Sequence, residues 1–311
     1  MSIRTVGICG IGQMGAAAAV SFERAGFRVL LWGRDPRKLA AVSPQLDQLR
    51  AFLRSHIGPP PCDAGSVTLT GDLAIIDAEA DLVMDAVAEV MDQKVDLFTR
   101  LRGAFDRGAI FITTTSGLSI TELGRRSGCG PRLAGTHFWN PPHLMPLVEV
   151  VRGQDTLPEV IDRVCAVITA IGKIPVRVNQ DVPGFIGNRL LHAMWREAIN
   201  LVQRGIASAE DVDRVARLTF GLRLAAVGPL ENMDLVGLDL VHAIHSYLLQ
   251  DLSDAPEPID LLTQNVREGK LGMKSDQGFY DWRSRDREAL IGRRDRQIVR
   301  QLAFLKEEGA L

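Results

Sequence analysis

A glycine triplet near the start of the chain, Gly10-Ile-Gly12-Gln-Met-Gly15, restricts the fold more than any other feature. It follows an apolar run, Thr5–Cys9, that predicts a buried strand, and it opens an alanine-rich stretch, Met14–Ala25, that predicts a helix. A second apolar run, Phe27–Trp32, predicts another strand. Two parallel strands joined by a helix form a right-handed β-α-β unit. The triplet in this position therefore predicts a dinucleotide-binding unit.

The residues of this loop have separate expected roles. Gly10 permits a tight turn, Gly12 lets the backbone approach a pyrophosphate, and Gly15 lets the helix pack close to the strand. Gln13 and Met14 begin the helix, whose first amides attract the diphosphate. We therefore expect all five residues to contribute to the dinucleotide site.

The end of the second predicted strand leaves the choice of nicotinamide cofactor open. An NAD site usually has an acidic residue here, which binds the ribose 2′-hydroxyl. This chain has Gly33 and then Arg34, which leave room for a 2′-phosphate and offer it a cation. Asp35 is an alternative partner for the ribose, and a solvated loop is the alternative setting for Arg34. These residues are compatible with NAD and with NADP.

Strand and helix patterns alternate in the first part of the chain and give way to helices alone in the second. The alternation predicts the α/β class, with a Rossmann-type doubly wound sheet. We predict a dinucleotide-binding domain over residues 1–182 and an all-α domain for substrate binding and dimerisation over 183–311. Further strands are expected at 66–70, 81–87, 109–114, 132–139, 147–151 and 174–178. Further helices are expected at 36–56, 92–105, from 119, and at 156–171, 185–203, 209–218, 239–249, 258–268 and 286–306.

Composition narrows the class of partner. The 311 residues carry a formal net charge of −2, which gives no electrostatic case for nucleic acid or for an anionic membrane. No apolar run approaches the roughly 20 residues that span a bilayer, and a strand-like run from Ile3 leaves no room for a signal peptide. The four cysteines form no C-x-x-C pair, so we expect reduced thiols, a cytoplasmic protein and no metal site. The helical part is apolar enough to predict a homodimer.

A histidine and a glutamate lie in two short apolar runs that follow one another. His137 is near the end of Leu133–Trp139, and Glu149 follows Pro146-Leu-Val. Each run is long enough for a strand, and the prolines between them forbid a helix. If the runs lie side by side, Glu149 can orient the imidazole of His137 and stabilise its protonated form. The pair predicts a general base for a hydroxyl proton, with a purely structural His–Glu pair as the alternative.

Taken with these residues, several separate motifs resemble the short-chain L-3-hydroxyacyl-CoA dehydrogenase family. The resemblance extends from Val6 to about Trp282 and implies a Rossmann-type domain followed by a helical domain. Besides the glycine triplet, the motifs are Asp81-Leu-Val-Met-Asp-Ala-Val-Ala-Glu89, Thr115-Ser116-Gly-Leu-Ser-Ile-Thr121, His137-Phe-Trp-Asn140-Pro, Leu147-Val-Glu149-Val-Val, Pro183-Gly-Phe-Ile-Gly-Asn188-Arg-Leu-Leu, Gly228-Pro-Leu-Glu, Gly237-Leu-Asp and Lys274-Ser-Asp-Gln-Gly-Phe-Tyr280.

The resemblance implies a role for four residues in catalysis. His137 matches the family's catalytic base and Glu149 its partner. Ser116 and Asn188 match the groups that hydrogen-bond the reacting oxygen. The implied reaction passes a hydride between a carbinol carbon and the nicotinamide while His137 takes the hydroxyl proton. Local roles, as a cap or turn residue for Ser116 and as a helix residue for Asn188, are the alternatives.

The resemblance also implies four contacts with the dinucleotide. Glu89, Lys94, Asn140 and Lys274 match the positions that make them in the family. The alternatives are a surface pair for Glu89 and Lys94 and a solvated loop charge for Lys274.

The chain departs from the coenzyme-A members of the family at two places. Those members carry a lysine where this chain has Pro146, and a lysine-rich helix after the second strand where this chain has few cations. The segment before Gly228 is longer than usual, as in a branch that oxidises hydroxy acids and a pyridine carboxylate. It includes Arg223, a candidate partner for a free carboxylate, with a surface or interface arginine as the alternative.

Three functions follow in order of expectation. The first is an NAD- or NADP-dependent dehydrogenase of a 3-hydroxyacyl-CoA, such as 3-hydroxybutyryl-CoA, in fatty acid metabolism. The second is the same chemistry on a hydroxy acid without coenzyme A, or on an aromatic alcohol or aldehyde carboxylate. The third is a dinucleotide-binding protein without turnover. The partner in each is a small molecule.

Overall fold

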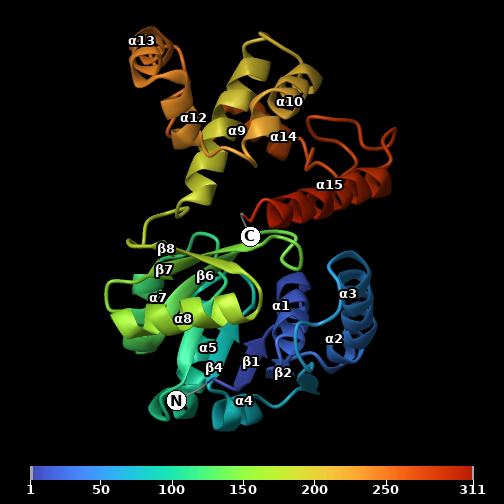
Figure 1. Ribbon diagram of the computed structural model, residues 1–311, viewed down its shortest axis with the longest axis vertical. Helices are drawn as coiled ribbons and strands as arrows, with labels where there is room; N and C mark the ends of the chain where they lie inside the picture. The colour runs from blue at the N-terminus through green and yellow to red at the C-terminus, as the bar shows by residue number, and fades with distance from the viewer. Residues whose placement is uncertain (1–2, 310–311) are drawn as a thin grey trace. The chain divides into compact units, whose positions relative to one another are not determined.

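The computed structural model describes residues 3–309, which form two compact units (Figure 1). The first unit contains residues 3–188 together with residues 305–309, and the second contains Arg189–Phe304. No helix within residues 3–309 is long and apolar enough to cross a membrane.

The first unit is built on one sheet of eight strands in the order β3-β2-β1-β4-β5-β6-β7-β8. Neighbouring strands are parallel except for β6 and β7, which are antiparallel. The strand order reverses between β1 and β4, where doubly wound folds bind dinucleotides. The strands are β1 (Thr5–Cys9), β2 (Arg28–Trp32), β3 (Ser66–Thr70), β4 (Leu82–Asp85), β5 (Ile110–Thr113), β6 (Leu133–Phe138), β7 (Leu147–Arg152) and β8 (Ile174–Val178).

Helices cover both faces of this sheet, which confirms the predicted α/β class. Residues of α1, α3 and α8 pack in the hydrophobic core on one face, and residues of α4 to α7 pack in the core on the other. Figure 1 shows α1 and α3 next to each other. The helices are α1 (Gln13–Arg24), α2 (Pro36–Ala40), α3 (Val42–His56), α4 (Leu73–Glu79), α5 (Met91–Arg100), α6 (Arg102–Asp106), α7 (Ile120–Ser127), α8 (Pro158–Ala170) and a short 3₁₀ turn, Gly130–Arg132.

Small side chains bring α1 against the sheet. Every residue from Gly15 to Phe22 is buried, and four of them are consecutive alanines. A Cβ atom on Gly15 would lie 1.8 Å from the carbonyl oxygen of Gly10, so only glycine permits this approach. The predicted reason for the third glycine of the triplet therefore matches the packing.

The stretch predicted as one helix over 36–56 forms two helices. Helix α2 ends at Ala40 and α3 begins at Val42. Pro44 explains the break, because its ring would clash with the carbonyl of Ala40 if the helix were continuous. In the first turn of α3 the missing amide proton of Pro44 costs nothing.

The second unit is helical, as predicted, and none of its residues is buried. Apolar side chains on its helices are widely exposed, including Leu230 at 74% and Leu235 at 75%. Its helices are α9 (Gly187–Gln203, from Arg189 onward), α10 (Ala209–Leu218), α11 (Phe220–Arg223), α12 (Pro229–Val236), α13 (Leu238–Leu248), α14 (Asp260–Arg267) and α15 (Arg287–Glu307, to Phe304).

Candidate active site

A groove of about 1120 Å³ lies at the carboxyl ends of β1, β2 and β4 in the first unit. Gly10 and Gly12 form part of its wall, together with residues that follow β2 and β4 and with residues of α2, α3 and α5. A Cβ atom on Gly12 would meet no atom within 4 Å, so the backbone there is open to a ligand. Gly10 has φ +128°, and a Cβ atom on it would lie 2.2 Å from the Ala86 carbonyl oxygen. A bare backbone before the N-terminus of α1 fits the diphosphate of a dinucleotide.

His137 and Glu149 lie opposite each other in the antiparallel pair of β6 and β7. His137 Nδ1 is 2.6 Å from Glu149 Oε2, and both side chains are almost fully buried. An ionised carboxylate only accepts hydrogen bonds, so Nδ1 donates and Nε2 is the basic nitrogen of the neutral ring. The structure thus brings the two predicted residues together and leaves Nε2 able to accept a proton.

The second oxygen of Glu149 is held by the backbone that leads into α9. Oε1 accepts hydrogen bonds from the amides of Ile186 at 2.9 Å and Gly187 at 3.0 Å. Burial alone would raise the pKa of Glu149, but the hydrogen bonds from His137, Gly187 and Ile186 together lower it below its ordinary value. Glu149 is therefore ionised at neutral pH and its orientation is fixed at both oxygens.

Two aromatic rings pack against the imidazole of His137. The Trp139 and Phe185 ring centroids are 5.0 and 5.6 Å from that of the imidazole. Phe185 is buried with φ +50°, a left-handed backbone that positions the next two amides for Glu149. A Cβ atom on Gly187 would lie 2.1 Å from the Trp139 ring, so the glycine admits the indole. Sequence reasoning did not identify these contacts, although the Pro183-Gly-Phe motif contains part of the signal.

Ser116 and Asn188 are also brought together. Asn188 Nδ2 donates to the backbone carbonyl of Ser116 at 3.1 Å. An amide nitrogen carries two protons, so the second remains for another acceptor. Asn188 follows Gly187, whose amide binds Glu149, so both predicted pairs meet at this segment.

Glu89 ties the loop that carries Ser116 to the end of β4. Its Oε1 accepts from the Ser116 amide at 2.8 Å and from the Thr115 hydroxyl. Glu89 itself is half-exposed. Its position lets it affect the placement of Ser116, in addition to the contact with a dinucleotide that the family resemblance implies.

Lys94 is fully buried rather than part of a surface pair. Its ammonium lies 2.7 Å from Asp85 Oδ2 and 3.4 Å from Glu89 Oε2. Asp85 also accepts from the Thr113 hydroxyl at 2.7 Å and the Val87 amide at 3.0 Å. The predicted contact of Lys94 with the dinucleotide stays a prediction, and the structure shows Lys94 supporting Glu89. The contact of Lys94 with Asp85, and that of Asp85 with Thr113, were not identified from the sequence, since the three residues lie on separate elements.

The remaining predicted cofactor contacts lie in different parts of the chain. Asn140 accepts a hydrogen bond from Gln13 Nε2 at 3.2 Å, which places it beside the glycine loop. Arg34 lines the groove. Lys274 and Arg223 belong to the second unit, and their contacts with dinucleotide and substrate stay predictions.

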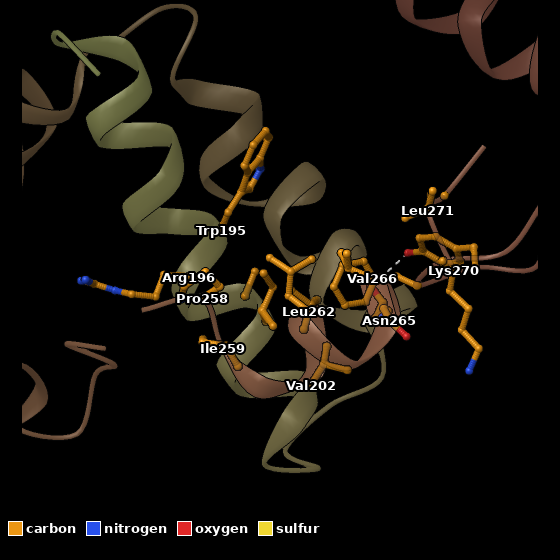
Figure 2. Close-up of a pocket in the computed structure, with 18 of the residues that line it drawn as sticks. Trp195, Arg196, Val202, Pro258, Ile259, Leu262, Asn265, Val266, Lys270 and Leu271 are labelled. Carbon is orange, nitrogen blue, oxygen red and sulfur yellow. Dashed lines mark hydrogen bonds between the residues drawn. The ribbon is translucent and has the colours of Figure 1, made fainter. Parts of the chain in front are cut away.

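The second unit has a hollow of its own, of about 910 Å³, between α9, α10, α14 and the segment 270–282. Apolar side chains such as Leu262 and Val266 line it, and Figure 2 shows them close together. Lys274 is among its lining residues. In the same view Arg196 and Lys270 direct their charged ends away from the apolar walls.

Comparison with known proteins defines the class to which this fold and site belong. The family model for the 3-hydroxyacyl-CoA dehydrogenase NAD binding domain matches residues 5–182. The model for the C-terminal domain of the same family matches residues 184–282. The chain belongs to the 3-hydroxyacyl-CoA dehydrogenase family, which confirms the resemblance inferred from its motifs.

Two curated relatives of this chain are named for different substrates. The chain is 33% identical over 298 residues to the 5-formyl-3-hydroxy-2-methylpyridine 4-carboxylate 5-dehydrogenase of Mesorhizobium japonicum, covering 96% of each chain. It is 35% identical over 286 residues to a probable 3-hydroxybutyryl-CoA dehydrogenase of Bacillus subtilis, covering 91% of this chain and 98% of that one.

Two solved structures belong to the same two kinds of relative, and they resemble this chain to different degrees. The crystal structure of a 5-formyl-3-hydroxy-2-methylpyridine 4-carboxylic acid 5-dehydrogenase, an NAD⁺-dependent dismutase, matches with TM-score 0.93 and 32% identity, covering 98% of this chain and 99% of that one. The (S)-3-hydroxybutyryl-CoA dehydrogenase of Ralstonia eutropha matches with TM-score 0.74 and 30% identity, covering 90% and 99%. These relatives confirm that the protein is an oxidoreductase and that NAD is its cofactor.

Proposed function

We propose that this oxidoreductase uses His137 as the general base that accepts a hydroxyl proton from its substrate. The observation that carries the proposal is the Glu149 carboxylate, which holds Nδ1 of His137 at 2.6 Å and leaves Nε2 basic. As the carbinol hydrogen departs with its electron pair, Nε2 takes the hydroxyl proton and the carbon–oxygen double bond forms. When bound, NAD⁺ supplies the acceptor for that hydride.

Ser116 and Asn188 are proposed to hold the reacting oxygen. Ser116 offers a hydroxyl on an exposed loop, and Asn188 keeps one amide proton that the Ser116 carbonyl does not use. Both donate to an oxygen that gains negative charge as its proton leaves, so they stabilise the transition state more than the alcohol.

We propose further that the substrate is a small hydroxy acid, or an aldehyde that also carries a carboxylate, rather than a coenzyme-A thioester. The higher TM-score with the pyridine-carboxylate dehydrogenase, 0.93 against 0.74, supports this choice. An aldehyde enters the same chemistry as its hydrate, whose hydroxyl proton His137 would take. Arg223 remains the candidate partner for the carboxylate.

One cation of the segment after β2 is engaged elsewhere, and the lysine that the coenzyme-A members carry before Leu147 is missing. In α3, Arg50 binds Glu23 at 2.7 Å and Asp47 at 2.8 Å. At the family's lysine position stands Pro146, and the adjoining Lys173 is buried and donates to the Met145 carbonyl at 2.7 Å. Burial lowers the pKa of Lys173 to about 8, so it is a weakened cation.

We propose that the domains divide near residue 182 and that the second domain, 183–311, pairs two copies of the chain. The second unit has exposed apolar residues on several helices, including Leu230, Leu235 and Tyr247 at 74%, 75% and 67%. Exposed apolar area of this extent is typical of a surface that another protein covers. A twofold pair of identical chains is the commonest such arrangement.

Matched substrate pairs test the proposed substrate class. With NAD⁺, the purified protein would be offered free 3-hydroxybutyrate, 3-hydroxybutyryl-CoA and 5-formyl-3-hydroxy-2-methylpyridine 4-carboxylate, and the loss of each substrate would be recorded, because dismutation of an aldehyde leaves no net reduced nicotinamide. We expect turnover of a free carboxylate and a much lower kcat/KM for the thioester. A kcat/KM that is higher for 3-hydroxybutyryl-CoA than for its free acid and the pyridine would reverse the choice and restore the thioester function.

A further inference from the structure

In the part of the chain that the structure describes, the adenosine end of the dinucleotide groove lacks an acidic side chain at the position that usually binds the ribose. At the end of β2, where an NAD site usually carries Asp or Glu, stands buried Gly33. A Cβ atom there would lie 2.9 Å from Cδ1 of Ile11, so the Ile11 side chain fills the space that an acid would need.

The neighbouring acid, Asp35, also lines the groove, but one of its two oxygens caps a helix. Its Oδ1 accepts from the backbone amides of Arg37 at 2.9 Å and Lys38 at 3.3 Å, which caps α2. The orientation of this carboxylate is therefore set by the amides of α2. The alternative role predicted for Asp35 is therefore not favoured by its hydrogen bonds.

Two cations line this end of the groove without an acidic partner. Arg34 and Lys38 are both lining residues with exposed side chains. Within residues 3–309, no acidic side chain forms an ion pair with either of them. Another arginine of the same groove, Arg100, is in contrast paired with Asp96.

The geometry points to a phosphate subsite: we propose that Arg34 and Lys38 bind the 2′-phosphate of NADP, so that the groove accepts NADP as well as NAD. A phosphomonoester carries a charge of about −1.5 to −2 near neutral pH. It accepts paired hydrogen bonds from a guanidinium, whereas the neutral 2′-hydroxyl of NAD gains little from two cations. The proposal concerns the cofactor alone and does not depend on the substrate.

A phosphate on the ribose 3′-oxygen, as in coenzyme A, has the same chemistry. The position of the cations favours the 2′-phosphate, because Arg34 and Lys38 line the same groove as Gly10 and Gly12 of the glycine loop. Nucleotides that carry the phosphate on the 2′-oxygen or on the 3′-oxygen distinguish NADP from coenzyme A directly.

Calorimetric titration of the full-length protein with nucleotide fragments tests the proposal without turnover. The ligands are 2′,5′-ADP, 3′,5′-ADP and 5′-AMP, and the variants are Arg34→Ala, Lys38→Ala and Arg37→Ala. Arg37 is the matched control, since it lies in the same turn but does not line the groove. Binding of 5′-AMP reports that each variant is folded.

In the wild type we expect 2′,5′-ADP to bind about tenfold more tightly than 5′-AMP, which is the scale of one hydrogen bond to a charged group. Arg34→Ala and Lys38→Ala should each reduce this preference, and Arg37→Ala should preserve it. NADPH and NADH should show the same pattern. Equal affinity for 2′,5′-ADP and 5′-AMP, tighter binding of 3′,5′-ADP, or an equal loss in Arg37→Ala would each overturn the proposal.

Discussion

The two units of this chain bury their side chains to very different extents. The first has two hydrophobic cores on the faces of its sheet, and even charged groups such as Asp85 and Lys94 are fully buried there. The second is made of amphipathic helices, and none of its residues is buried. The first unit therefore fixes the geometry of its site through its own packing, whereas the second presents apolar surface suited to a partner.

The comparison explains why the proposed chemistry rests on the first unit. His137 and Glu149 face each other across a strand pair, and their surroundings are fixed by buried contacts. Ser116 and Asn188 are joined to the same segment by hydrogen bonds. Arg223 and Lys274, which are in the second unit, remain predicted contributors.

Replacement of the base should have the largest effect. His137→Gln should lower kcat by about 10³-fold, the scale of a general base. NADH affinity, measured by fluorescence titration, should be unchanged, because the glycine loop follows β1 whereas His137 lies on β6. A kcat within a few-fold of wild type would show that His137 has only a structural role.

Loss of a buried cation should destabilise the first unit strongly. Lys94→Met would leave Asp85 charged and unpaired in the core, at a cost of about 3–5 kcal/mol in the free energy of unfolding. The same substitution at Lys270, which forms an exposed ion pair with Glu268 in the second unit, should change that free energy by about 0.5 kcal/mol or less. Urea denaturation of both variants compares the units directly, and equal losses would contradict the difference between them.

A charge on the apolar surface of the second unit should separate the proposed dimer. Leu235→Glu loses the burial of a leucine in each copy, about 1.5–3 kcal/mol per side chain, and places a carboxylate in the interface. Sedimentation velocity should show a shift from dimer to monomer. Leu157→Glu, at an exposed apolar position of the first unit, is the matched control and should leave the assembly unchanged. A monomeric wild type would remove the explanation for the exposed apolar helices.

The smallest predicted effect is on acid stability. Because the pKa of Glu149 is lower in the folded protein than its ordinary value, this carboxylate stabilises the fold above the ordinary pKa. That contribution is lost as the pH falls through the lowered folded pKa. Glu149→Gln should therefore be less stable than wild type at neutral pH and should show a shallower loss of stability in acid. A parallel pH dependence for both proteins would show that Glu149 does not contribute.

Much of the fold could be predicted, because hydrophobic periodicity and the glycine triplet are local signals. Strands 66–70 and 174–178 and the helix 209–218 coincide with the structure. Helix α4 was not predicted, since its seven residues are too few for a clear period. The stretch 92–105 forms two helices, because the Asp77 carboxylate binds the Ala104 amide and lies where a side chain on Gly103 would be.

The candidate site also contains some contacts that the local sequence predicts and others that only the tertiary fold brings together. His137 and Glu149 could be paired from the sequence because two adjacent strands with a short connection place them opposite each other. The burial of Lys94 could not be predicted, because its partner Asp85 on β4 is held by Thr113 on β5, and these two residues come together only when the strands pair. The packing of Phe185 on His137 joins segments 48 residues apart for the same reason.

The pH dependence of kcat/KM for oxidation, in wild type and His137→Gln, tests the central claim most directly. The wild-type value should rise with pH in a one-proton step, since Nε2 must be unprotonated to accept the hydroxyl proton. The variant should lack this step while it still binds NADH. A step with the same midpoint in His137→Gln would contradict the account, because another group would then be the base.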